Sequence, residues 1–405
     1  LGLTHSNKII NMIVCYCTFV IEDMELLSVV LGRRLCSVLI LLSIILFSSL
    51  AQSRTFNAEG SDLMLGVGAR NIALAGAVTA GTGDIYSAYW NPAGLAKIEG
   101  SQITISNKPT YELIPVNYLA AASTTDNFLN TGWKLTYAFA FIPRLHIYGN
   151  GTFYEDEFES IFMRYALPDL AGDFTGELES KTKDYRFAFG FTPLNRPEFR
   201  AGFSIGYVDC GTEFCGVTAE DPGNYTIASS GATAVTFNFG VQYDYSPRLA
   251  LGVNLNDVNT SLDVETVTTD NTGTTTEIVT IEFPRELALG VIWRYSDSID
   301  LSVDYRHLEG SYGDYKIKFR TARLGLEWKK PWEDIDIQAG FLIPIEITSD
   351  KTESLDAPYF GAPSLGLSWS FEYFRLESAL FVDPVSSYQA NEPRAGLELS
   401  VTYNF

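Results

Sequence analysis

Histidine, cysteine and basic residues are scarce in this chain. Its 405 residues include 3 His and 5 Cys, and two of the histidines, His146 and His307, lie in unrelated contexts. A closed metal site needs about four ligands, and the two cysteines beyond residue 51 cannot supply them, so we expect no metal centre. We expect no cofactor either. Outer-membrane phospholipases use a Ser–His pair, but the segment "VDYRHLEG" around His307 has no Ser motif of that kind. We therefore expect no enzyme.

Positive charge is outnumbered throughout. The chain has 28 Lys and Arg against 49 Asp and Glu, which gives a formal net charge of −21. Binding to nucleic acid requires a basic face, so this function is excluded. Charged residues of both signs make up 19% of the chain, below the roughly 25% of soluble domains, while aromatic residues reach 13%. This combination indicates a protein that exposes apolar surface to a medium other than water.

A long hydrophobic run lies near the amino end, after a second apolar patch within residues 1–23. Arg33-Arg34 precedes "LCSVLILLSIILFSSLAQS", which closes in small residues near Ala51. A basic start, an apolar centre and a small-residue exit predict a cleaved secretory signal, and the run is short for a span of ~20 residues. We expect translation to start at Met24, residues 1–51 to comprise an upstream extension and the signal, and no lipid anchor, because Cys36 precedes the apolar run.

Removal of that signal leaves two cysteines, Cys210 and Cys215, in the segment "DCGTEFC". A close and even pair in an exported protein predicts a local disulfide. The alternative is two free thiols in a loop.

From Gly100 onward the chain alternates between apolar and polar or small residues. In the segment 133–141, for example, Trp, Leu, Tyr and two Phe interleave with Lys, Thr and Ala. Such alternation places one face of a strand in an apolar medium. We predict strands at 101–107, 116–123, 133–142, 185–192, 199–208, 233–244, 249–257, 286–295, 299–308, 320–329, 335–343, 363–373, 374–383 and 395–405.

Three observations favour a membrane barrel over a soluble sandwich. Many of these segments have the ~9–11 residues that a tilted strand needs to cross a bilayer. Aromatic residues gather toward strand ends, as in interfacial girdles. Connections alternate between tight turns and long segments, the latter at 143–184, 209–232, 258–285 and 344–362. We therefore predict an all-β fold, a transmembrane antiparallel β-barrel of about 14 strands over residues 101–405. The Thr-rich stretch 266–280 is interpreted as a mobile loop or as an extension of a hairpin.

The last strand, "LELSVTYNF", ends on an aromatic residue. Tyr403 and Phe405 lie on its apolar face, and a terminal Phe on an alternating strand is typical of the signal that the barrel-assembly machinery reads.

Residues 52–100 lack a strand period and are rich in Gly and Ala, with a helical candidate around 69–78. A barrel of this size has a lumen too wide for its own side chains, so we predict that this segment is a small hatch inside the lumen. The inward strand positions are correspondingly small, with Gly, Ala, Ser and Thr recurring. The alternative is an ordinary periplasmic loop.

Two short motifs in this segment carry a family resemblance. Gly68-Ala69-Arg70 leads through small residues to Asn91-Pro92-Ala93-Gly94. The stretch Leu65–Ala96 resembles the start of the FadL-type outer-membrane transporters of hydrophobic compounds, and is closer still to the related PorV/PorQ group. The resemblance implies a fourteen-stranded barrel with its hatch in the lumen.

The Asn91-Pro92 pair also has a direct physical interpretation. Proline biases Asn91 away from helix, and the Asn amide can bond to nearby backbone groups, which suits a tight corner. Tyr86, Tyr89 and Trp90 next to it either line an apolar hatch pocket or pack the hatch against the wall.

The leading hypothesis is a monomeric outer-membrane channel for passive uptake of hydrophobic, fatty-acid-like molecules, in contact with outer-membrane lipid and lipopolysaccharide. One alternative is a PorV-like interaction protein that holds exported proteins in type IX secretion. Another is a structural barrel without cargo.

Overall fold

The computed structural model describes residues 56–59, 65–110, 115–153, 174–210, 219–221, 225–258, 260–270, 272–312, 315–332, 334–349, 361–383 and 394–405. They all belong to one compact unit, Thr55–Phe405. The predicted upstream extension and signal, residues 1–51, lie outside the described residues, as does Cys215.

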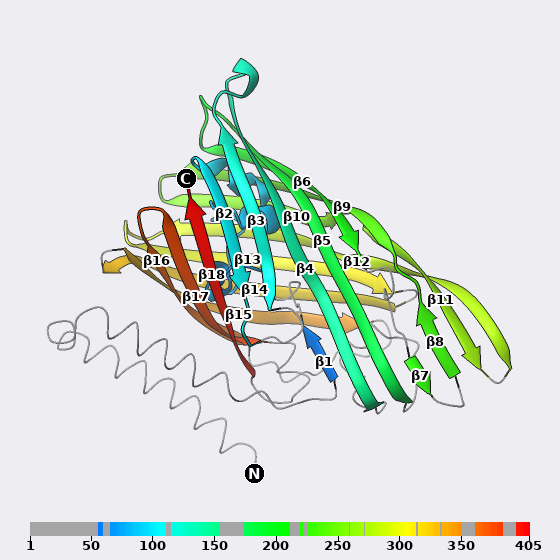
Figure 1. Cartoon of the computed structure of the whole chain (residues 1–405). Coiled ribbons are helices and arrows are strands. Elements are labelled where there is room, and N and C mark those ends of the chain that lie inside the picture. The colour runs from blue at the N-terminus through cyan, green and yellow to red at the C-terminus, as the bar shows by residue number, and fades with distance from the viewer. Residues whose placement is uncertain are drawn as a thin grey trace, which may run out of the picture. The chain divides into compact units, whose positions relative to one another are not determined.

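The described strands close into an antiparallel barrel of 14 strands (Figure 1). Each strand pairs with the next along the chain, and the last pairs with the first through Val401 and Ile105. The wall consists of β2 (Ser101–Asn107), β3 (Val116–Thr125), β4 (Trp133–Phe153), β5 (Phe174–Pro193), β6 (Phe199–Asp209), β9 (Thr233–Ser246), β10 (Leu249–Val258), β12 (Gly273–Arg294), β13 (Ile299–Tyr312), β14 (Tyr315–Trp332), β15 (Ile335–Ser349), β16 (Ala362–Ser370), β17 (Phe374–Asp383) and β18 (Arg394–Asn404).

Four shorter strands extend this wall at the end of the barrel where the long connections lie. β11 (Ser261–Asp270) follows β10 and pairs with the first half of β12, and β8 (Tyr225–Ser229) pairs with β11. β7 (Ala219–Asp221) pairs with β8, and β1 (Phe56–Glu59) pairs with β4 beyond the reach of β3. The Thr-rich stretch 266–280 is therefore part of the β11–β12 hairpin, one of the two alternatives that the sequence left open.

Every predicted strand is present, and the fold prediction is confirmed. Several strands are longer than predicted, however. β4 continues to Phe153 and β5 begins at Phe174, within the predicted connection 143–184, and β12 begins at Gly273 rather than near residue 286. The prediction ended each strand where the apolar alternation stopped. Main-chain pairing continues past that point because its hydrogen bonds do not depend on apolar side chains, and Thr is well suited to strands.

The two faces of the wall differ as the alternation predicts. On β9 the exposed fractions of Val235, Phe237 and Phe239 lie between 36% and 50%, whereas Thr236 and Asn238 between them are fully buried. Large apolar side chains thus face outward, and polar or small ones face the lumen, which is the arrangement of a barrel immersed in hydrocarbon.

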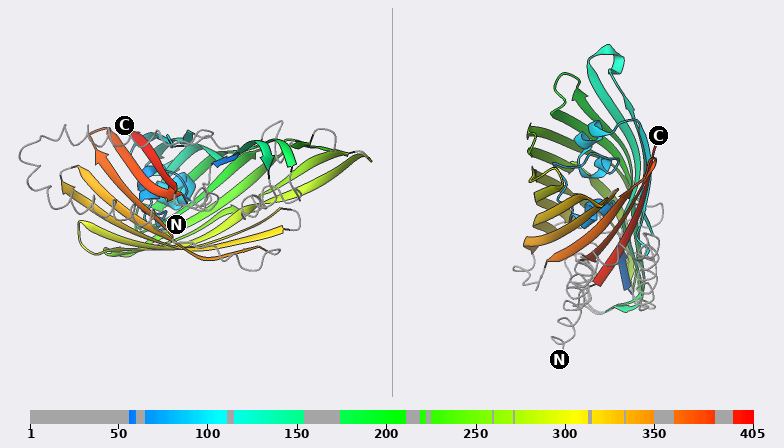
Figure 2. Two further views of the ribbon diagram at one scale, coloured as in Figure 1. Left: turned by 90° about the horizontal axis from the view of Figure 1, so that it is seen from below. Right: turned by 90° about the vertical axis from the view of Figure 1, so that its left-hand side faces the viewer.

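The lumen holds residues 65–98 of the amino-terminal segment (Figure 2). It contains α3 (Ala69–Ala73), α4 (Ser87–Trp90) and the 3-10 helix η2 (Pro92–Lys97); a further 3-10 helix, η3 (Phe128–Asn130), lies between β3 and β4. α3 is shorter than the predicted helix 69–78 because Ala75 and Gly76 take positive φ angles of 52° and 73°, which end a right-handed helix. None of the described helices has both the length and the apolarity to cross a membrane.

Candidate functional site

The hatch, residues 65–98, is the candidate site because it fills the lumen. Most of its side chains are buried, and Ile85, Ala88 and Leu95 have no exposed surface. Its apolar residues pack against small inward residues of β3 and β4, including Ala120 and Ala138. The hatch thus shares one core with the wall.

A belt of glycines in the wall lets the hatch backbone approach closely. A Cβ atom on Gly190 would lie 2.7 Å from the Ala96 nitrogen, and one on Gly202 would lie 2.5 Å from the Pro92 oxygen. Cross-strand pairing sets these glycines side by side. The belt comprises Gly190, Gly202, Gly240, Gly252, Gly290, Gly325, Gly340 and Gly366, all facing hatch atoms. Real side chains at these positions would displace the hatch.

The Gly68-Ala69-Arg70 element fastens the start of the hatch to two strands. The Gly68 and Ala69 N–H groups donate to Glu398 Oε1 at 2.7 Å and to Ser400 Oγ at 2.9 Å, both on β18. Arg70 donates two parallel hydrogen bonds of 2.6 Å to Glu327 on β14. A two-pronged, charge-assisted pair of this kind fixes orientation as well as position.

The Asn91-Pro92-Ala93-Gly94 element makes the corner between α4 and η2. Asn91 Oδ1 accepts from the Ala93 N–H at 3.1 Å, and Asn91 Nδ2 donates to the Thr79 carbonyl at 2.8 Å. Pro92 occupies the first position of η2, where its missing N–H costs nothing. A Cβ on Gly94 would lie 2.6 Å from the Thr82 carbonyl oxygen. The element therefore ties two turns of the hatch together.

The three aromatic residues before this corner pack the hatch against the wall as well as within itself. Trp90 donates through Nε1 to the Val67 carbonyl at 2.8 Å, and its ring meets the edge of Tyr89 at 5.1 Å. The Tyr86 hydroxyl lies 2.8 Å from Thr104 Oγ1 on β2. None of the three lines the cavity described below.

Buried charges facing the lumen were not anticipated from the sequence. Asp304 on β13 accepts from the Val78 N–H at 3.1 Å, the Thr79 N–H at 3.0 Å and the Thr79 hydroxyl at 2.6 Å. Arg306 donates to Glu286 at 2.8 Å and to the Gly76 carbonyl at 3.2 Å. The available signal was "SVDYRH", where acidic and basic residues occupy the inward positions on either side of the outward Tyr305.

A second ionic cluster lies between β4, β5 and β10. Arg144 donates to both Asp257 oxygens, at 3.1 and 2.9 Å, and lies 3.4 Å from Asp184. Arg186 pairs with the same Asp184 at 2.5 Å. All four side chains are buried, so each charge depends on its partners for compensation. The two clusters therefore place fixed, paired charge inside the lumen.

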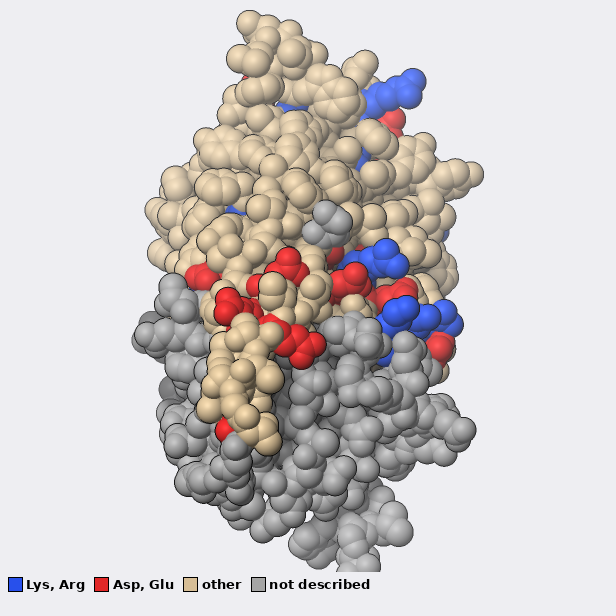
Figure 3. All heavy atoms as spheres, turned by 90° about the vertical axis from the view of Figure 1, so that its right-hand side faces the viewer, with Lys and Arg blue, Asp and Glu red and all other residues tan. Residues whose placement is uncertain are grey.

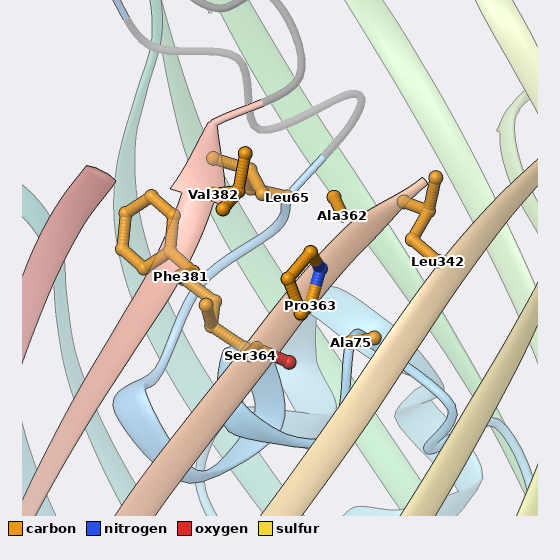
Figure 4. Close-up of a pocket in the computed structure, with 9 residues that line it drawn as sticks. Leu65, Ala75, Leu342, Ala362, Pro363, Ser364, Phe381 and Val382 are labelled. Atoms are coloured by element: carbon orange, nitrogen blue, oxygen red, sulfur yellow. The ribbon is translucent and has the colours of Figure 1, made fainter. Parts of the chain in front are cut away.

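One small cavity opens between the hatch and the wall (Figure 4). Leu65, Ile72 and Ala75 line it from the hatch side. Its only polar side chain is Ser364, whose hydroxyl is engaged with the Ala73 carbonyl at 2.9 Å. The wall contributes Leu342 of β15, Ala362, Pro363 and Ser364 of β16, and Phe381 and Val382 of β17. No charged side chain lines the cavity, so its walls are apolar.

The remaining predicted residues lie away from the lumen or at its edge. Cys210 is disulfide-bonded; since Cys215 lies outside the described residues, the pairing of the two stays a prediction. Tyr403 and Phe405 stack at 5.5 Å between ring centroids and are both exposed on the outer face. His307 also faces outward, where its Nδ1 accepts from Arg320 at 3.3 Å.

Comparisons with known proteins identify the fold. No family model and no curated protein matches the chain. Among solved structures, the toluene transporter TbuX of Ralstonia pickettii is similar with a TM-score of 0.55 and 12% identity, over 84% of this chain and 99% of that one.

Two further structures show the same likeness. The toluene transporter TodX of P. putida has a TM-score of 0.53 and 13% identity, over 84% and 99% of the two chains. A Pseudomonas aeruginosa FadL homologue has a TM-score of 0.50 and 12% identity, over 86% and 99%. At these identities the likeness establishes the shared fold.

Proposed function

We propose that this chain is a member of the FadL-type superfamily and acts as a passive uptake channel for hydrophobic small molecules in the bacterial outer membrane. The fold shared with two toluene transporters and a FadL homologue supports this proposal. So do the Gly68-Ala69-Arg70 and Asn91-Pro92-Ala93-Gly94 elements, which both belong to the buried hatch.

The observation that carries the proposal is the shared barrel fold with a buried hatch in its lumen, and the small apolar cavity beside the hatch is where we expect a ligand to enter. Leu65 and Phe381 face it from the hatch and the wall, so a ligand bound there contacts both the fixed and the removable part of the channel. Occupation of the cavity favours a hatch that moves away from β15–β17, since a ligand larger than the cavity can fit only if one side yields. The apolar ligand then leaves through the space that the hatch vacates.

The interaction-protein alternative is not adopted. It rested on closeness to the PorV/PorQ group, and none of the structures reported above is of that kind.

The proposal is tested by measuring uptake of radiolabelled toluene into bacterial cells that have an outer membrane but lack their own channel for hydrophobic compounds. Expression of the chain is expected to accelerate toluene uptake. The variant Ala362→Phe, which fills the cavity, is expected to reduce uptake to the rate of cells that do not express the chain. The matched control is Ala322→Phe, which adds the same ring on the outward face of β14. Equal uptake by cells with and without the chain would refute the proposal.

A further inference from the structure

The outward faces of β12 to β15 form rows that run across the four strands. The apolar row nearest to the long connections consists of Leu289, Tyr305, Ala322 and Ile343, aligned by cross-strand pairing. The next row toward the short turns is apolar as well, with Val291, Val303, Leu324 and Phe341. These rows belong to the surface that meets lipid chains.

The rows change character toward the long connections. The next one contains His307, Arg320 and Glu346, and the one beyond it contains Arg285, Glu309 and Lys318. We call Arg285, Lys318 and Arg320 the basic margin. Their side chains are 67%, 41% and 40% exposed. In Figure 3, charged side chains of both signs gather in a band across the described surface, next to a broad area with few charges.

The carboxylates in these rows do not fully neutralise the three cations of the basic margin. Glu309 is shared among Arg285 at 3.7 Å, Lys318 at 3.9 Å and His307 Nε2 at 3.5 Å, so neither cation holds it by a short hydrogen bond. Arg320 pairs closely with Glu346 at 2.5 Å, but a guanidinium has five N–H groups and keeps donors for a further acceptor. Three cations thus face two carboxylates, a local positive excess on a chain whose net charge is −21.

From this arrangement we infer that the basic margin is a binding site for the phosphate of an anionic lipid in the leaflet on the side of the long connections. Cations just beyond an apolar surface lie at headgroup height, where each attracts anionic lipid. The apolar rows below contact the acyl chains of the same molecule. A lipid therefore gains both the ionic contact of its phosphate and the apolar contact of its chains, whereas a free phosphate ion gains only the ionic contact. The inference rests on the membrane placement in the proposed function, but not on uptake.

Native mass spectrometry of the full chain in detergent tests this inference. The probe is bis-phosphorylated lipid A, compared with the same glycolipid after removal of its phosphates and with inorganic phosphate. We expect retained lipid A on the unaltered protein, little of the dephosphorylated form, and no retained inorganic phosphate. The triple variant Arg285→Gln, Lys318→Gln, Arg320→Gln should bind lipid A at least about tenfold more weakly, because each cation contributes near the surface.

A charge-matched control isolates the site. Arg196 and Arg248 are exposed on short turns and Lys330 is exposed near the end of β14, all at the other end of the barrel, and their replacement by Gln should leave lipid A binding unchanged. Equal loss in both triple variants, or none in the first, would overturn the inference. Toluene uptake is measured on the same variants: loss of lipid binding with intact uptake supports the lipid site alone, and intact lipid binding with no uptake by the unaltered chain refutes the proposed function alone.

Discussion

Arg70 in the hatch and Glu327 on β14 form a two-pronged ion pair, with both N–O distances at 2.6 Å. Glu327 also accepts from Gln338 on β15 at 3.2 Å, so the carboxylate joins the hatch to two neighbouring strands. This pair links a helix of five residues, too short to be stable by itself, to the rigid wall. The fixed position of the hatch therefore depends on the wall's buried charges.

Loss of this ion pair should loosen the hatch. Arg70→Gln leaves Glu327 without its cation, a change that costs about 3–5 kcal/mol for a buried pair. We expect more frequent conducting events in planar bilayers than for the unaltered protein. Lys329→Gln is the control, since it removes an ion pair with Asp300 near a short turn, away from the hatch. Identical conductance in the two variants would contradict the role given to the Arg70–Glu327 pair.

The glycine belt predicts a strong contrast between neighbouring positions of β6. Gly202→Val pushes side-chain atoms into the Pro92 backbone, at a cost of about 1–3 kcal/mol or more. Ala201→Val adds comparable bulk on the outward face, away from the hatch. We expect the first variant to give a leaky barrel or a lower unfolding temperature, and the second to behave like the unaltered chain. Gel mobility of the unheated protein shows whether the barrel itself has formed in both.

Lys97 at the end of η2 predicts a pH dependence of stability. Burial, and then the nearby positive charge of Arg200, lower the pKa of its ammonium group to about 7. The unfolded chain keeps the ordinary value of 10.5 and therefore binds more protons than the folded one between these two values. The free energy of unfolding should thus rise as the pH increases from about 7 toward 10.

Lys97→Met should remove this rise, because the side chain no longer titrates. Unfolding in urea at a series of pH values measures the effect, and the difference between the two proteins isolates Lys97 from all other groups. A pH profile that is the same for both would show that the Lys97 ammonium group titrates with its ordinary pKa.

The disulfide is tested by mapping. Digestion without reductant should yield one peptide species in which Cys210 and Cys215 are joined, and reduction should separate it. Because the loop between them is short, its closure removes little entropy from the unfolded chain, so Cys215→Ser should lower stability by no more than about 3 kcal/mol. Alkylation of both residues in the unreduced protein would show free thiols instead.

The strand positions could be predicted because each wall strand faces two media. Outward residues such as Phe237 and Phe239 alternate with inward Thr236 and Asn238 because one face meets hydrocarbon and the other the lumen, and this alternation can be recognised in the sequence. Strand lengths could not be predicted in the same way. Beyond the apolar rows, the pairing of Thr268 with Thr275 depends on the partner strand and leaves no period in hydrophobicity.

The lumen was harder to predict. Small inward residues indicated a close-packed hatch, but the partners of Asp304 and Arg306 lie on the hatch about 225 residues away in sequence. Nothing local identifies those contacts. The cavity combines residues from the hatch and three wall strands, so it exists only once the barrel has closed.

Crystals of the full chain soaked with 4-bromotoluene test the central claim most directly, because bromine is located by its anomalous scattering. We expect a bromine peak beside Leu65, Ile72 and Phe381, together with a displaced hatch. The peak should be lost in Ala362→Phe. Bromine found only among the outward apolar side chains, with the interior empty of it, would contradict uptake through this barrel.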